Sequence, residues 1–202
     1  MWAGTALSSS RTCGTALNVV CKLNEYPIDL NQMAKSKTLK LTKGQLFNHY
    51  AVVPFLLIVP ILTTYSLFQI YVTKNYIGVR SAQEMIWTGY PWIALAILAY
   101  VVQRKRLQFK EFKIPVDGEH FKKAGLDTAA KLHWKIKHIS GKTIVAIRPG
   151  TISSGGSWGE LITIFNEHDK ILINSICDPN NIISVASWGW NRKNIKTFIE
   201  AL

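Results

Sequence analysis

Two long stretches without a charged side chain constrain the fold of this chain most. Neither residues 44–73 nor residues 85–103 contain an Asp, Glu, Lys or Arg. A helix needs about 20 mostly apolar residues to cross a hydrocarbon core about 30 Å thick. A buried helix of a soluble protein seldom stays uncharged for so long. We therefore expect an α-helical membrane hairpin over residues 45–103, with two transmembrane helices at about 49–73 and 85–102.

The residues on either side of the two stretches predict the orientation of the hairpin. Both outer flanks are basic, with Lys35, Lys37, Lys40 and Lys43 before the first stretch and Arg104, Lys105, Arg106, Lys110 and Lys113 after the second. The connecting loop, residues 74–84, carries two basic residues and one acidic residue. Segments rich in Lys and Arg stay in the cytoplasm. We expect a multi-pass protein of a bacterial inner membrane with both termini cytoplasmic.

The amino-terminal segment lacks the pattern of a folded domain. Residues 1–32 show no apolar periodicity, and no basic segment leads an apolar run as in a secretory signal peptide. Met33 then opens a stretch that resembles a native bacterial start. We expect residues 1–44 to be a disordered basic tail whose first part, residues 1–32, is dispensable or lies outside the native protein. A genuine regulatory tail is the alternative.

The carboxy-terminal part has the size and pattern of one small α+β domain. After a basic linker at 104–113, residues 114–202 contain a helical stripe that begins near Asp117 or Glu119 and ends at Leu132. Strand patterns follow at 134–139, 142–148, 160–166 and 170–176, with a shorter one at 182–187. The last residues, from Asn191, repeat apolar side chains at helical spacing. The pattern predicts an antiparallel sheet of four or five strands with helices packed on one face.

The charge of the chain indicates an anionic partner. The formal net charge is +12, and residues 104–202 hold 16 basic and 9 acidic residues. Such an excess suits nucleic acid or an anionic membrane face, and in a bilayer-bound protein lipid headgroups are the nearer partner. Cys13, Cys21 and Cys177 form neither a disulfide framework nor a metal set. We expect anionic lipid or another membrane protein as the partner, and no nucleic acid, cofactor or metal.

The start of the last helix is the strongest candidate for a binding site. Asn191 is predicted as its N-cap, with Arg192 and Lys193 in the first turn. Free amides, the positive helix end and two cations together favour an anion. Trp188 and Trp190 either flank this site, enter the membrane interface or pack in the core.

The juxtamembrane residues Arg104, Lys105 and Arg106 are the second half of the predicted binding surface. They follow directly after the second apolar stretch, so the chain itself holds them close to the bilayer. Basic residues contribute about 1 kcal/mol each near an anionic leaflet. The start of the last helix joins this surface only if the fold turns it toward the membrane.

Three other constellations have simpler structural explanations. The glycine-rich stretch 153–160 lacks the spacing of a phosphate-binding loop and leads into a strand. Cys177 with His133 or His138 suggests a nucleophile and base, but a single cysteine after a strand is more typical of a buried side chain. Asp117, with Glu119 and His120, suggests a metal, yet capping of the helix explains Asp117.

Several short motifs make the carboxy-terminal part resemble a known group of proteins. Ser157-Trp158-Gly159, Asn174-Ser175 and Trp188-Gly189-Trp190-Asn191 look like segments of small two-span bacterial membrane proteins with a cytoplasmic α+β domain. The resemblance covers about residues 112–202 and implies no activity. We therefore expect a non-enzymatic binding module at the membrane surface. A membrane-anchored enzyme of hydrolase type is the alternative.

The charge asymmetry leads to a topology prediction. A phosphatase reporter fused after Leu202 should be inactive, because the fusion stays in the cytoplasm, and one inserted near Gly78 should be active. Activity measured in intact cells decides between the two orientations. The reverse pattern would contradict the predicted orientation.

Overall fold

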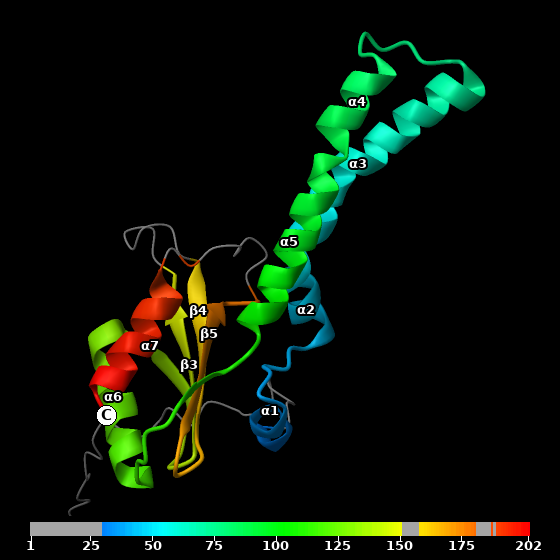
Figure 1. Ribbon diagram of the computed structural model, residues 1–202. Coiled ribbons are helices and arrows are strands. Elements are labelled where there is room, and N and C mark those ends of the chain that lie inside the picture. The colour runs from blue at the N-terminus through cyan, green and yellow to red at the C-terminus, as the bar shows by residue number, and fades with distance from the viewer. Residues whose placement is uncertain (1–29, 151–157, 181–186, 188) are drawn as a thin grey trace, which may run out of the picture.

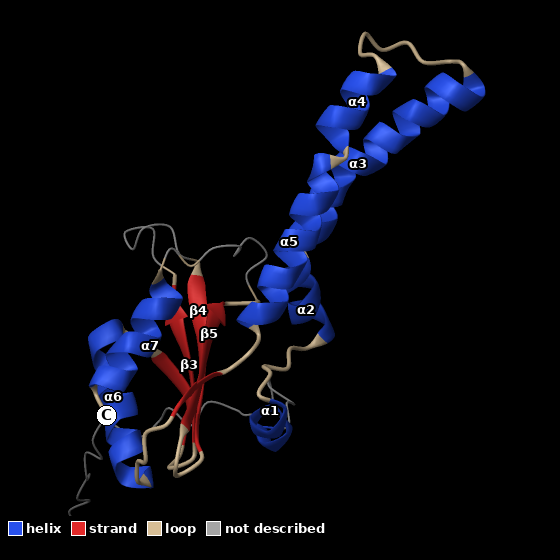
Figure 2. Cartoon of the chain, in the orientation of Figure 1, coloured by secondary structure: helices blue, strands red, loops and turns tan. Residues whose placement is uncertain are grey.

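A pair of long helices projects from an α+β body in the computed structural model of the chain (Figures 1 and 2). The structure describes residues 30–150, 158–180, 187 and 189–202. Along the described chain, three α-helices and a π-helical turn precede the hairpin loop, and two α-helices follow it. A five-stranded sheet with two further helices then completes the body.

The hairpin consists of two helical stretches that are long and apolar enough to cross a membrane. The first is α3, Val52–Phe68, continued by a π-helical turn, Gln69–Thr73; the second is α4, Ala82–Gly89, followed by α5, Pro91–Arg106. In the most apolar 18-residue part of each stretch, only 11% and 17% of the residues are buried. The core helix of a soluble protein is mostly buried. Both stretches lie within a few residues of the predicted ranges.

Prolines and small residues shape the hairpin. Pro60 lies inside α3, and the Thr64 hydroxyl donates to its carbonyl oxygen at 2.8 Å. Pro91 begins α5 and so divides the second stretch, because a proline has no N–H for the preceding turn. A Cβ atom on Gly89 would lie 2.1 Å from the Thr63 hydroxyl, so only glycine allows this close approach.

The structure differs from the sequence-based expectation of a disordered tail over residues 30–44. This stretch contains α1, Leu30–Ser36, and the start of α2, Lys43–Tyr50. Met33 and Leu39 are buried against the sheet. Lys35 and Lys37 lie close to these two residues in the sequence and had suggested an exposed basic segment. The apolar residues of this stretch were too few to predict packing. Residues 1–29 lie outside the described part of the chain.

The sheet is antiparallel throughout, with the strand order β1-β5-β4-β3-β2. The strands are β1, Lys110–Phe112; β2, Lys135–Ile139; β3, Thr143–Pro149; β4, Gly159–Asn166; and β5, Ile171–Cys177. The last four follow one another along the chain as predicted. A further strand, β1, pairs with β5 from within the expected linker. The stretch 182–187 proposed as a strand lies, except for Ser187, outside the described residues.

Each face of the sheet has its own apolar core. On one face lie α6, Gly118–Leu132, and α7, Trp190–Glu200, as predicted; Phe121, Ile162 and Phe198 are fully buried there. The opposite face is covered by α1 and by the chain that leaves α5. This second core explains why α1 is ordered: without it, the apolar side of β4 and β5 would face water.

The core position of Phe198 allows a stability test. Replacing Phe198, which is 0% exposed, by Ala should lower the free energy of unfolding by about 3–5 kcal/mol. The matched control is Leu126→Ala on α6, where the side chain is 53% exposed and the loss should be about 0.5 kcal/mol or less. Urea titration of the full chain in nonionic micelles measures both. Equal losses would show that α7 is peripheral.

Candidate functional site

A cleft of about 460 Å³ lies where α5 enters the body and α7 begins. It exists because β1 is short. Lys110 pairs with Ile173, but β5 continues to Cys177 without β1 beside it. The free edge of β5 forms the floor, and residues from two further segments complete the lining. The lining residues are Lys105, Arg106, Gln108, Lys110, Ile173, Asn174, Ser175, Ser187, Gly189, Asn191, Arg192 and Ile195.

The charge of this basic cleft is one-sided. Lys105, Arg106, Lys110 and Arg192 line it, and no carboxylate does so among the described residues. The Arg106 guanidinium also donates to the Gln103 side-chain oxygen at 3.4 Å, which holds it close to the end of α5. A lining that contains four basic residues and no described acidic residue favours an anionic ligand.

The start of α7 adds backbone donors to the cleft. Its N-cap is Gly189, in the left-handed region with φ of +88°, and not Asn191 as the sequence suggested. The helix therefore begins two residues earlier, because glycine adopts this conformation without strain. The Asn191 and Arg192 amides are in the first turn, where helical N–H groups have no helical acceptor. No described residue accepts a hydrogen bond from either.

A chain of hydrogen bonds, buried except for its last member, reaches the Asn191 side chain. The Trp134 indole N–H donates to Asn194 Oδ1 at 3.2 Å, and Asn194 Nδ2 donates to Ser175 Oγ at 3.2 Å. The Ser175 hydroxyl then donates to Asn191 Oδ1 at 3.1 Å. An indole is only a donor, so it sets the direction of the first two bonds; the Ser175 hydroxyl keeps its proton, which it donates to Asn191 Oδ1. Asn191 therefore keeps its amide nitrogen, a donor, for the cleft that it lines.

Asn174 ties β5 to the end of α5. Its amide nitrogen donates to the carbonyl oxygens of Arg106 and Gln108, both at 2.9 Å. Turning the amide over would face its oxygen against two carbonyls, so its orientation is determined. The residue lines the cleft and is 3% exposed, and Oδ1 is buried without a hydrogen-bond partner. A buried acceptor without a partner is costly, so the two hydrogen bonds of the amide nitrogen must outweigh the cost of the unsatisfied oxygen.

The structure brings four of the predicted site residues together: Lys105, Arg106, Asn191 and Arg192. Arg104 is exposed on α5 outside the lining. Lys193 lies over the Trp190 ring, 4.3 Å from its centroid, and Arg148 lies over the same ring at 3.7 Å. Trp190 is therefore engaged within the body. Trp188 lies outside the described residues.

Lys110 and Asn174 belong to the cleft but were not predicted. Lys110 had been assigned to a linker, and only its pairing with Ile173 places it on the sheet edge. Asn174 is a polar residue in an apolar strand, ILINSIC, and that interruption was the available signal.

Side-chain contacts join the hairpin to the body beside the cleft. Gln45 and Asn48 on α2 donate to Asn180 Oδ1 at 3.1 Å and to the Pro179 carbonyl at 3.0 Å. His49 Nε2 lies 3.0 Å from the carbonyl oxygen of Gln103, the residue before Arg104. Burial lowers the pKa of His49, although this hydrogen bond opposes the shift. The neutral imidazole therefore holds the end of α5 in place.

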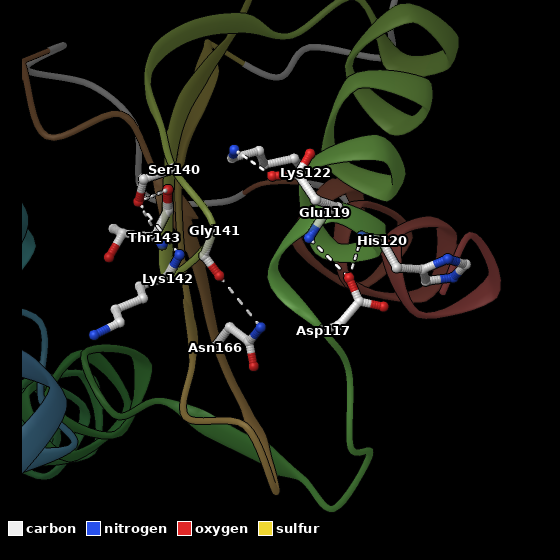
Figure 3. A network of polar contacts seen from close by, with 9 residues as sticks. All are labelled: Asp117, Glu119, His120, Lys122, Ser140, Gly141, Lys142, Thr143 and Asn166. Carbon is white, nitrogen blue, oxygen red and sulfur yellow. Dashed lines mark hydrogen bonds and ion pairs between the residues drawn. The ribbon is translucent and has the colours of Figure 1, made fainter.

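The other groups of residues considered as sites have structural roles. Burial raises the pKa of the Cys177 thiol, which disfavours the thiolate that a nucleophile needs. Asp117 caps α6 by accepting from the Glu119 and His120 amides at 2.9 Å, and these bonds lower its pKa (Figure 3). Within the described ranges, no three His, Cys, Asp or Glu side chains form a metal-binding group. The glycine-rich stretch is described only from Trp158 onward.

No family model, curated protein or solved structure matches the chain. Its function is therefore inferred from the geometry of the basic cleft and its place beside the hairpin.

The hydrogen-bond chain can be tested at its centre. Ser175→Ala should lower the free energy of unfolding by about 1–3 kcal/mol, because the amide nitrogen of Asn194, a residue that is 1% exposed, loses its acceptor. Ser36→Ala, on an exposed end of α1, is the matched control and should change it by about 0.5 kcal/mol or less. Urea titration in micelles measures both. A loss at Ser175 no larger than the control would contradict the chain.

Proposed function

We propose that the chain is an integral inner-membrane protein whose α+β body binds an anionic headgroup at the bilayer surface. The observation that carries this proposal is the composition of the basic cleft. Two segments almost 90 residues apart in the sequence, the end of α5 and the start of α7, contribute cations to one concave surface. The proposed role is binding without enzymatic turnover.

The position of the cleft along α5 supports a headgroup as ligand. Val101 and Val102 are the last exposed apolar residues of the hairpin, and Lys105 follows three residues after Val102. At 1.5 Å per residue this is roughly 4.5 Å along the helix. The polar layer on each side of the hydrocarbon core is about 5–7 Å thick. If α3 to α5 span a bilayer, the cleft opens at the level of the headgroups.

Electrostatics favour this site over the rest of the basic surface. The attraction of a basic residue to an anionic leaflet fades within a Debye length of about 8–10 Å. Lys105, Arg106 and Arg192 meet in the cleft beside the hairpin, while Lys196 lies farther along α7 and outside the lining. Under the predicted orientation, the cleft faces the cytoplasmic leaflet.

The lining itself supports binding and not turnover. No His, Cys, Asp or Glu of the described residues lines the cleft, so the side chains that most often transfer protons in catalysis are absent from its described wall. Lys and Arg instead pair with phosphate oxygens. The Asn191 amide and the first-turn N–H groups provide further donors to such oxygens.

A charge-matched pair of variants tests this function. The full chain in nonionic micelles is titrated with a short-chain phosphatidylglycerol, and affinity is measured by calorimetry at low salt. Arg192→Ala should weaken binding about fivefold, equivalent to the loss of about 1 kcal/mol. Lys196→Ala removes the same charge from the same helix but outside the cleft, and should change affinity less than about twofold.

Added salt should weaken binding by the unaltered chain. Equal weakening by the two substitutions would indicate attraction to net charge alone. Unchanged binding in Arg192→Ala would remove the cleft as the site and leave a protein partner as the better explanation.

A further inference from the structure

The basic cleft has two walls, because it wraps around the edge of the sheet where β5 continues without β1. Neighbouring residues of a strand point to opposite faces, and both Asn174 and Ser175 of β5 line the cleft. Ser175 donates to Asn191 of α7 on one face, whereas Asn174 donates to the carbonyl oxygen of Arg106 on the other. The start of α7 therefore forms one wall, and the end of α5 forms the second.

The four basic residues of the lining divide between these walls. Lys110 is paired with Ile173, and directly opposed residues of an antiparallel pair share a face of the sheet. Ile173 is buried in the core beneath α6 and α7, so the Lys110 side chain leaves the sheet on the α7 side, which also carries Arg192. Lys105 and Arg106 belong to the last turn of α5. Each wall thus supplies two basic side chains.

The charged ends of these side chains are within reach of a ligand. Lys105, Lys110 and Arg192 are exposed, and none of the three makes an ion pair or a side-chain hydrogen bond with a described residue. Arg106 is half-buried and also donates to a side chain within α5. The α7 wall adds the amide nitrogen of Asn191 and the first-turn N–H groups. A single phosphate therefore prefers the α7 wall and does not neutralise the two cations of the other wall.

The size of the cleft agrees with more than one phosphate. Its volume of about 460 Å³ equals that of about 15 water molecules at roughly 30 Å³ each. A phosphate group is only a few atoms in size and fills a minor part of this space. A second phosphate on the α5 wall would add attraction without crowding the first, because the sheet edge lies between the two walls.

Building on the proposed function, we infer that the basic cleft binds a ligand with two phosphate groups, one on each side of the β5 edge. Arg192, Lys110 and the α7 amides hold one phosphate. Lys105 and Arg106 hold the other. Arginine and lysine side chains bind phosphate oxygens through charge-assisted hydrogen bonds. At the level of the headgroups, this chemistry belongs to a phospholipid in which a short polyol joins two phosphates. A soluble bisphosphate offers the same chemistry without the acyl chains.

Two lipids that differ in the number of phosphates test the inference without altering the protein. The full chain in nonionic micelles is titrated by calorimetry with phosphatidylglycerol, which has one phosphate, and with cardiolipin, in which a glycerol joins two. We expect cardiolipin to bind about tenfold more tightly, because the first bound phosphate holds the second beside its own wall; two independent phosphates per molecule would give about twofold. A preference no larger than this statistical factor would overturn the two-phosphate assignment and leave the proposed function standing. No binding of either lipid would overturn the proposed function.

A charge-matched pair of variants separates the second phosphate from general attraction to charge. Lys105→Ala should weaken cardiolipin binding about fivefold and phosphatidylglycerol binding only about twofold, because the single phosphate binds the other wall. Arg104→Ala removes the same charge one residue earlier on α5, outside the lining, and should weaken the binding of either lipid about twofold or less. Both side chains are exposed, so a urea titration should find both variants folded. Equal weakening of cardiolipin binding by the two substitutions would overturn the assignment.

The deacylated headgroup identifies the source of the two phosphates. Bis(glycerophospho)glycerol keeps both phosphates of cardiolipin and lacks its acyl chains. It should bind the full chain more weakly than the intact lipid, because the acyl chains hold the lipid headgroup in the micelle beside the hairpin. Equal binding would overturn the lipid as the source and assign the cleft to a soluble bisphosphate.

Discussion

The hydrogen bonds from Asn174 to the carbonyls at the end of α5 hold the two halves of the molecule together. They fix the point at which the second membrane-type helix becomes part of the sheet. The chain that follows, through Leu107 and Phe109, is bonded on its other side to Leu39 and Lys37. Because this segment is hydrogen-bonded on both sides, the end of the hairpin is fixed to the body. The cationic end of α5 therefore has a defined place beside the sheet edge.

The same constraint explains the shape of the basic cleft. The β1 strand begins only at Lys110, since the residues before it are occupied in leaving α5. This leaves the second half of β5 without a neighbour on that side. The start of α7 is held above the gap by Ser175 and Asn194. An unpaired sheet edge is usually a liability for aggregation; here α5 and α7 shield it.

The regular elements of this chain were predictable because their signals are local. Strand patterns in four consecutive segments and the stripe that contains Phe121 identified the sheet and α6, and the absence of charge identified the hairpin. The packing of α1 was not predictable, because Met33 and Leu39 are buried in a cluster with residues distant in the sequence, such as Leu107 and Leu172. The three-residue β1 is likewise defined only by its partner β5.

The candidate site was predictable in part for the same reason. The cations at the ends of α5 and α7 stand out in the sequence, but their meeting in one cleft depends on the exit of α5 at the edge of β5. Arg104 and Lys193 carry the same charge as Lys105 and Arg192, but the fold places their side chains outside the lining of the cleft. The N-cap was misplaced because the Gly189 conformation competes with the capping propensity of Asn191.

The central claim is that the start of α7 lies at the level of the headgroups. The most direct measurement is the accessibility of a spin label at position 192, in a chain whose cysteines are replaced, to a paramagnetic metal chelated on lipid headgroups of a bilayer. The comparison label is at His168, in the exposed β4–β5 turn at the opposite end of the sheet (Figure 1). The account predicts strong relaxation at 192 and little at 168. Equally weak relaxation at both positions would contradict it.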